Sequence, residues 1–191
     1  MKSLVVFESM YGNTRAIAEA IALELAALGP AEAVPAGEAT SAKVADADFL
    51  VVGAPTHVHT IPSARTRKAA LAEHSGELQI DPSASGPGIR EWLEELPRLG
   101  TPRYAAVFDT RIDIVALLSG RASRAIGRRL HRRGYVLIAD PESFLVDKQS
   151  HLIDTEVMRA RQWGTGLTAL VQDPTGAGSW EMAKPSRAPF N

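Results

Sequence analysis

Short apolar runs, separated by longer segments with helical spacing, constrain the fold of this chain more than any other feature. Each run has five or six residues, which is too short for a buried helix and typical of a strand covered on both faces. Four runs are clear, and a fifth, weaker run spans 33–35. The four clear runs are Lys2–Phe7, Asp48–Gly53, Tyr104–Phe108 and Tyr135–Ala139.

The segments between these runs carry apolar residues at helical spacing and end at Gly or Pro. Alternating strands and helices imply βαβ units, a parallel sheet and right-handed crossovers. The sequence therefore predicts an α/β fold with ligand-binding loops beyond the carboxyl ends of the strands. The expected helical faces are Ile17/Ala20/Ile21/Leu25/Leu28, Ile89/Trp92/Leu93/Leu96, Ala122/Ile126/Leu130 and the segment 154–171.

Composition limits the possible functions. The 191 residues form one domain of ordinary size, for which we expect bounds of 1–172, followed by a Pro/Gly-rich tail at 173–191. The net charge of −1 argues against general binding to nucleic acid or to a membrane. No cysteine is present, which excludes disulfides and thiolate chemistry. Neither a signal peptide nor a membrane-spanning run is visible, so we expect a cytoplasmic protein. The sequence does not indicate an oligomeric state.

The loop after the first run has the residues of a phosphate site. It joins a strand directly to a helix, so unpaired backbone N–H groups and the helix dipole face its concave side. Ser9, Asn13 and Thr14 add polar donors, and Gly12 permits a close approach or a positive φ. The loop has no Lys or Arg and no dinucleotide or NTPase motif, which favours a phosphate monoester. Alternatively, Ser9 and Asn13 only cap the helix.

These residues also resemble a known signature. The pattern Val5-Val6-Phe7-Glu8-Ser9-x-x-Gly12-x-Thr14-x-x-x-Ala18-x-x-Ile21 is similar to the FMN-phosphate signature of flavodoxins. The resemblance continues through Val51–Thr56 to about Val171. It implies a flavodoxin-like, doubly wound, five-stranded parallel sheet of order 2-1-3-4-5 with helices on both faces. It also implies FMN as the cofactor, with its phosphate in the loop formed by Ser9, Met10, Tyr11, Gly12, Asn13 and Thr14.

By the same resemblance, two further loops line the flavin ring. The first contributes Pro55, Thr56, His57, Val58 and His59, and the second contributes Asp109, Thr110 and Arg111. Neither has the aromatic residue that commonly covers the ring in flavodoxins, so we expect histidine to lie beside it. The two histidines could instead form a metal pair or lie on the surface, but no third ligand accompanies them in the loop, and we predict no metal site. We also find no signature of catalytic residues.

The first of these loops, at 54–62, contains no glycine and two prolines, so we expect it to avoid positive φ. That reasoning predicts weak stabilisation of the one-electron-reduced flavin. Arg111 and the basic run Arg65, Arg67 and Lys68 are candidates for positive charge at the rim of the site. Alternatively, the run from 65 to 68 is ordinary solvated charge, which the sequence slightly favours.

Function remains open between three hypotheses. The first is an FMN-dependent electron carrier that serves a redox partner protein or a small-molecule electron acceptor. The second is an FMN-dependent NAD(P)H oxidoreductase of the quinone-reductase type, and the third is a non-redox interaction module on the same fold. A further basic segment, with Arg at 121, 124, 128, 129, 132 and 133, is either a docking face for an acidic partner or a solvated helix face.

Overall fold

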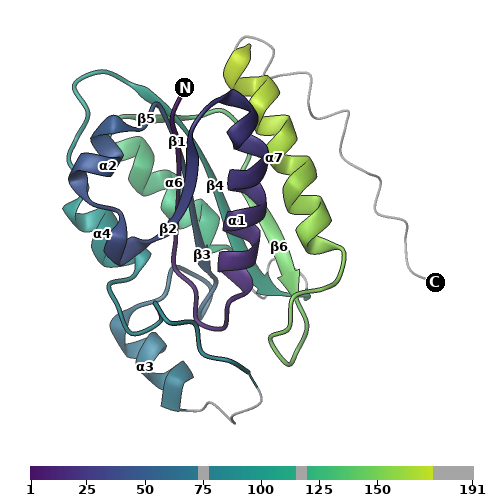
Figure 1. Ribbon diagram of the computed structural model, residues 1–191. Helices are drawn as coiled ribbons and strands as arrows, with labels where there is room; N and C mark the ends of the chain where they lie inside the picture. Colours follow the sequence, from purple (N-terminus) through teal and green to yellow (C-terminus); the bar gives the residue numbers. More distant parts are fainter. Residues whose placement is uncertain (73–77, 115–119, 174–191) are drawn as a thin grey trace.

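A computed structural model describes residues 1–72, 78–114 and 120–173 of the chain (Figure 1). Its sheet has the order β2-β1-β3-β4-β5, with β6 also paired to β4, and every pairing is parallel. The fold class and the strand order predicted from the sequence are therefore confirmed. The strands are β1 (Ser3–Phe7), β2 (Ala31–Pro35), β3 (Phe49–Pro55), β4 (Arg103–Ile112), β5 (Tyr135–Leu137) and β6 (Glu142–Val146).

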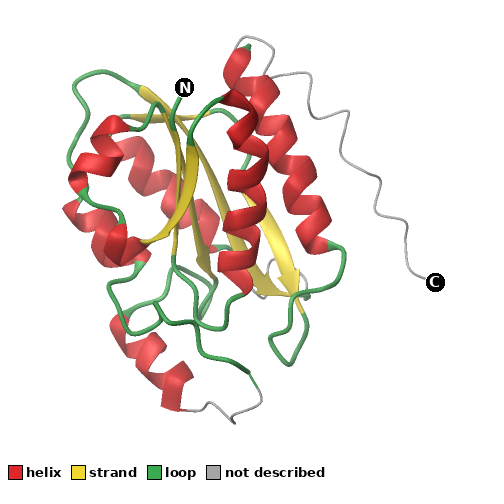
Figure 2. Cartoon of the chain, in the orientation of Figure 1, coloured by secondary structure: helices red, strands yellow, loops and turns green. Residues whose placement is uncertain are grey.

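Helices cover both faces of the sheet (Figure 2). On one side lie α1 and α7, and on the other lie α2, α4 and α6, while α3 lies beyond the carboxyl ends of the strands (Figure 1). The helices are α1 (Asn13–Leu25), α2 (Ser41–Asp46), α3 (Ala64–Ala72), α4 (Ile89–Glu95), α6 (Ala122–Arg132) and α7 (Glu156–Gln172), with short 3-10 turns η1 (Ala26–Leu28) and η2 (Ala36–Glu38).

The period-two alternation within β1 divides the core. Leu4 and Val6 pack on the side of α4 and α6, whereas Val5 and Phe7 pack on the side of α1 and α7. All four side chains are buried, which explains why the strand reads as a continuous apolar run. The register places Phe7 of β1 beside Gly53 of β3. The strand ends, and with them the loops that follow, therefore meet at one edge of the sheet.

The fifth position of the sheet is divided between two strands. β5 pairs with Arg103–Ala105 at the start of β4, and β6 pairs with Phe108–Ile112 at its end. The sequence predicted a single strand at 135–139 and a loop from 140, because Asp140 and Pro141 interrupt the apolar run. After this interruption the chain instead returns to the same side of β4 and pairs with it again as strand β6.

The N-terminus and the end of α7 lie away from the ligand-binding edge (Figure 1). The N-terminal ammonium group donates to the carbonyl of Leu28 (3.1 Å), and the last turn of α7 lies at the same end of the molecule as the N-terminus (Figure 1). The predicted tail beyond Asp173 lies outside the described residues. Among the residues that are described, no helix is long and apolar enough to cross a lipid bilayer.

Candidate functional site

A cavity of about 160 Å³ lies at the carboxyl ends of β1, β3, β4 and β6 and is open on one side. Ten of the fourteen residues predicted for the cofactor line it, so the three loops chosen from the sequence do meet in space. They are Ser9, Met10, Tyr11, Asn13, Thr14, Pro55, Thr56, His57, Thr110 and Arg111. Four lining residues were not predicted: Ile112, Val146, Asp147 and Ser150.

The first loop has unpaired backbone donors beside this cavity, which Asn13 and Thr14 line and the predicted Gly12 does not. Gly12 adopts φ 81° and precedes α1, whose first internal hydrogen bond runs from Ala16 N–H to the Gly12 carbonyl. Within the described part of the chain, the backbone N–H groups of Gly12, Asn13 and Thr14 donate to no protein atom. Three adjacent N–H groups at the positive end of a helix are suited to binding an anion.

Two hydroxyl groups lie on the floor of the cavity. Thr14 Oγ1 from α1 and Thr110 Oγ1 from β4 are 2.8 Å apart, and both side chains are buried. One of the two hydrogens is used in this mutual bond, so the other can point to a ligand. The pair therefore supplies a neutral donor next to the free N–H groups.

The alternative of simple helix capping is wrong for Asn13, whose amide donates to the carbonyl of Ser150 (2.6 Å). The Ser9 hydroxyl does accept from the N–H of Arg15, but at 3.4 Å. Ser150 belongs to a turn in which the Asp147 carboxylate accepts from the N–H groups of Gln149 and His151 (2.9 and 2.8 Å). The sequence predicted a loop at 140–150 on this edge of the sheet but assigned none of its residues to the cofactor, whereas Asp147 and Ser150 line the cavity.

Arg15, the cation that follows the first loop, does not line the cavity. Arg15 forms a two-pronged ion pair with Asp81, with Nε–Oδ2 and Nη2–Oδ1 distances of 2.8 and 2.7 Å. This pair, together with hydrogen bonds from Ser83, holds the pKa of the Asp81 carboxyl at about 2, despite its burial. The N–H of Asp81 also donates to the carbonyl of Met10 (2.9 Å). Arg15 thus anchors the segment 81–83 to the back of the loop.

The second loop contains a tight turn that the sequence reasoning predicted wrongly. His57 and Thr60 exchange backbone hydrogen bonds of 2.9 and 3.0 Å, and the two residues between them have positive φ, 44° at Val58 and 69° at His59. A two-residue hairpin requires this geometry, even though Asn and Gly are its usual residues. The argument against positive φ in this loop, and its consequence for the one-electron-reduced flavin, therefore loses its basis.

Contacts from the start of α6 fix this turn. Gly120, at φ 72°, packs so closely on the turn that a β-carbon there would lie 2.3 Å from the Cα of His59. The N–H of Ala122 donates to the hydroxyl of Thr56 (3.0 Å). Side chains at 57 and 59 do not share an extended face, so the premise of a metal pair fails. No cluster of three or more metal-ligating side chains occurs in the described ranges.

His57 lines the cavity, whereas Val58 and His59 do not. Burial lowers the pKa of the His57 imidazole, and the positive charge of Arg67 adds to this effect. The imidazole is therefore neutral at pH 7 and can donate from one ring nitrogen and accept at the other.

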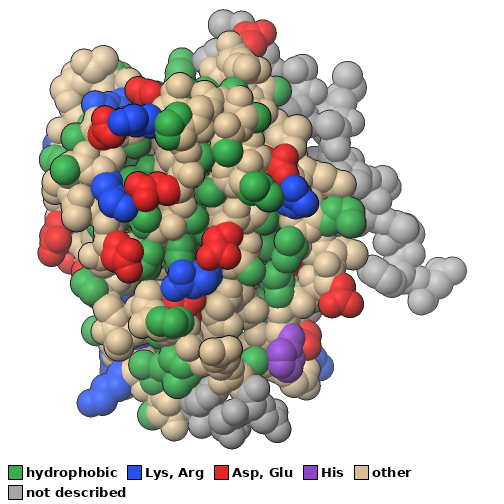
Figure 3. All heavy atoms as spheres, in the orientation of Figure 1, with side chains coloured by type: hydrophobic (Ala, Val, Ile, Leu, Met, Phe, Trp, Pro, Cys, Tyr) green, Lys and Arg blue, Asp and Glu red, His purple; other side chains and the backbone are tan. Residues whose placement is uncertain are grey.

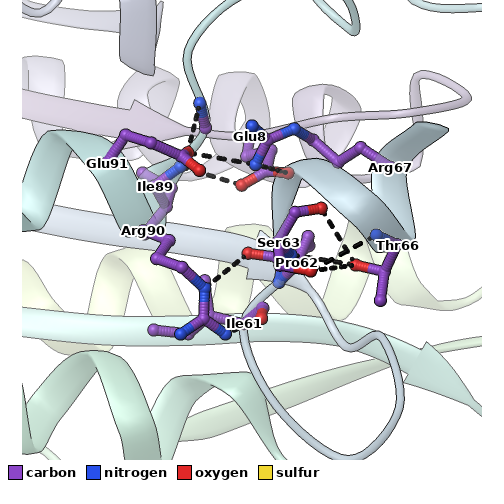
Figure 4. Close-up of polar contacts among 10 residues, drawn as sticks. Glu8, Ile61, Pro62, Ser63, Thr66, Arg67, Ile89, Arg90 and Glu91 are labelled. Atoms are coloured by element: carbon purple, nitrogen blue, oxygen red, sulfur yellow. Dashed lines mark hydrogen bonds and ion pairs between the residues drawn. The ribbon is translucent and has the colours of Figure 1, made fainter.

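The basic run after this loop does not line the cavity. Arg67 is buried between two carboxylates, 3.0 Å from Glu91 and 3.6 Å from Glu8, as Figure 4 shows. Arg90 of α4 donates to the carbonyls of Ile61 and Pro62 (2.5 and 3.0 Å; Figure 4). These contacts fix the path of the chain from the turn into α3. The expectation of a basic rim is wrong for Arg67.

The predicted third loop is the end of strand β4. The sequence ended this strand at Phe108 because a charged residue follows. Asp109 lies on the opposite side of β4 from the cavity, where its Oδ2 accepts from the N–H and Oγ of Ser123 (2.8 and 2.6 Å). Asp109 was predicted to contact the cofactor, but it does not line the cavity. Arg111 does line the cavity, with Nη1 donating to the carbonyls of Ile112 and Ile114 (3.3 and 2.8 Å).

Comparison with known proteins agrees with this architecture. Residues 4–77 match the model of a flavodoxin domain. No curated protein sequence matches the chain.

Three solved structures illustrate the likeness in fold. A flavodoxin from the domain Archaea is 17% identical, with a TM-score of 0.60, covering 90% of this chain and 99% of its own. The flavodoxin of Streptococcus pneumoniae TIGR4 is 20% identical (TM-score 0.60; coverage 88% and 99%). A flavodoxin, WrbA-like protein from Agrobacterium tumefaciens is 18% identical (TM-score 0.57; coverage 90% and 97%). The strand order and these likenesses show that the chain has a flavodoxin-like fold, and its first part, residues 4–77, matches the flavodoxin domain model.

Proposed function

We propose that the chain binds FMN non-covalently in this cavity and transfers electrons through it. The observation that carries the proposal is the row of three free N–H groups, at Gly12, Asn13 and Thr14, beside the Thr14–Thr110 hydroxyl pair. These neutral donors fit a phosphate monoester, and the helix dipole stabilises its charge. When bound, FMN would supply the one- and two-electron chemistry.

The residues around the cavity have distinct roles in this proposal. Thr14 and Thr110 hold the phosphate, and the Asn13–Ser150 contact keeps the neighbouring turn in place. Thr56, His57 and Tyr11 face the region where the ring would lie. The buried guanidinium of Arg111 gives this wall a positive charge, which would favour the anionic form of a reduced ring.

Fluorescence titration with FMN, with riboflavin as the control, tests the proposal. We expect FMN to bind much more tightly than riboflavin, because only FMN has a phosphate for the N–H groups. Equal affinities would place the phosphate elsewhere. No binding of either would leave the fold intact and favour a non-redox interaction module.

A second candidate function is an FMN-dependent NAD(P)H oxidoreductase. It is favoured by the open side of the cavity and by the absence of an aromatic side chain in the turn at 57–60. Rapid bleaching of bound FMN by NADPH or NADH alone would support it. Reduction that needs a separate reductase would support the carrier.

A further inference from the structure

The segment 121–133 concentrates positive charge. It holds six arginines and one histidine in thirteen residues and no Asp or Glu, although the whole chain has 21 basic and 22 acidic residues. Burial of Ala122, Ala125, Ile126 and Leu130 sets the inward side of α6. Arg124, Arg128 and Arg132 repeat at the i, i+4 spacing and are exposed, so they form one stripe along the outer side, here called the arginine face.

Among the described residues, the arginine face has no ion-pair partner. In the part of the chain that the structure describes, none of the α6 arginines forms an ion pair with an Asp or Glu. Some exposed charges on other elements are paired, as in Lys2–Asp46, Lys43–Glu32 and Arg161–Glu24. Figure 3 shows this pairing on another face, where blue and red side chains lie next to each other.

The helix dipole favours Arg129 and Arg132 in the last turn of α6, but it opposes the charges at the start of the helix. Arg121 and Arg124 lie at the N-terminal end of α6, whose first turn has no acidic residue. The helix dipole opposes positive charge there. Nearby, burial lowers the pKa of Arg129, and the charges of Arg90, Arg132 and Arg128 reinforce this effect. Mutual repulsion and an unfavourable dipole are not what a purely structural helix face needs.

The arginine face begins beside the cavity. Gly120 contacts the backbone of His59, and Ala122 N–H donates to Thr56, which itself lines the cavity. The tip of the same turn carries Val58, whose side chain is 75% exposed. An exposed apolar tip next to a charged stripe is a suitable surface for transient docking at the edge of the cofactor.

We propose that the arginine face and Val58 form the docking surface for an acidic redox protein. The proposal rests on the proposed electron-transfer function, which supplies the reason for docking at the cavity edge. Complementary charge would steer the partner to this face and orient it there. A protein fits better than nucleic acid or a lipid surface, because the stripe is one helix wide on a molecule of net charge −1.

The test uses a plant-type [2Fe–2S] ferredoxin, a strongly acidic redox protein, as the probe. Binding to the purified chain is measured calorimetrically at 20 and 200 mM NaCl, for the wild type and for the double variant Arg124→Glu/Arg128→Glu. The matched control is Arg65→Glu/Lys68→Glu, which makes the same change of charge on exposed residues of α3. We expect salt to weaken wild-type binding roughly tenfold, the α6 variant to lose at least as much, and the control to change less than about threefold.

Four outcomes would overturn the proposal: no binding by the wild type, binding insensitive to salt, equal losses in the two double variants, or tighter binding to phosphatidylglycerol vesicles or single-stranded DNA than to ferredoxin. Circular dichroism confirms that each variant is folded. Because calorimetry needs no flavin, binding is also measured on flavin-free protein. A failure of FMN binding is thereby distinguished from a failure of docking.

Discussion

Replacement of Val58 tests the strained turn beside the cavity. A β-branched residue at φ 44° is an outlier, and a left-handed conformation costs a non-glycine residue about 1–2 kcal/mol. Glycine removes this cost, but its greater freedom in the unfolded chain lowers the stability of the fold by about 0.5–1 kcal/mol. The side chain is 75% exposed, so little packing is lost. We expect Val58→Gly to stabilise the fold by about 1 kcal/mol, or about 2–4 °C in Tm.

The assay is urea and thermal unfolding of the flavin-free protein, so that ligand binding does not contribute. Val58→Asn is a second variant, because Asn tolerates this conformation without the full flexibility of Gly, and we expect it to stabilise the fold at least as much. The control is Val136→Gly in β5, where the side chain is 45% exposed and the backbone is extended. That change should destabilise by about 0.5–1 kcal/mol. Equal losses at both positions would refute the claim that the turn is strained.

Three further changes test the site and its supports. Thr14→Val should weaken FMN binding about tenfold in fluorescence titration and leave riboflavin binding unchanged, since one donor to a charged group contributes about 1.5 kcal/mol. The pKa of Asp81 in the folded protein is about 2, which lies below the ordinary value. The Asp81 carboxylate therefore contributes about 2 kcal/mol to the free energy of unfolding above pH 4, and this contribution is lost as the pH falls toward 2. In urea unfolding, the Asp81→Asn variant should not show this loss of stability between pH 4 and 2. Arg67→Leu should cost about 3–5 kcal/mol at pH 7, because it leaves Glu8 buried without its cation. Burial already raises the pKa of Glu8. As the pH falls and Glu8 takes up a proton, the stability of the variant should therefore approach that of the wild type. A stability difference that stays the same at pH 5 would contradict this account.

The apolar runs predicted the sheet well because each strand is buried on both faces. β1 and β3 agree with the runs at 2–7 and 48–53 within two residues, and the weak run at 33–35 is part of β2. The end of β4 could not be found in this way. Asp109 looks like the start of a loop, and only the distant Ser123 explains how its carboxylate is accommodated inside the sheet.

The site was predictable where it depends on local sequence and not where it depends on contacts between distant segments. The donors of the loop at 9–14 follow from a strand–helix junction. A loop from 140 was expected at this edge of the sheet, but its contacts with the cavity, through Asp147 and Ser150, depend on the distant Asn13 and could not be assigned from the sequence. The conformation of Val58 was predicted wrongly because local preference argues against it, while the packing of Gly120 on His59 enforces it. Helices α2 and α3 also escaped prediction, since each is short and buries few side chains.

The position of the two ends of the described chain has a practical consequence. Met1 is held beside η1, and α7 finishes at the same end of the molecule, opposite the cavity (Figure 1). A tether at Met1 would therefore leave the cavity and its surrounding loops facing outward. Protein attached to an electrode through its N-terminus would present the edge of a bound cofactor to the solution, where a soluble partner can reach it.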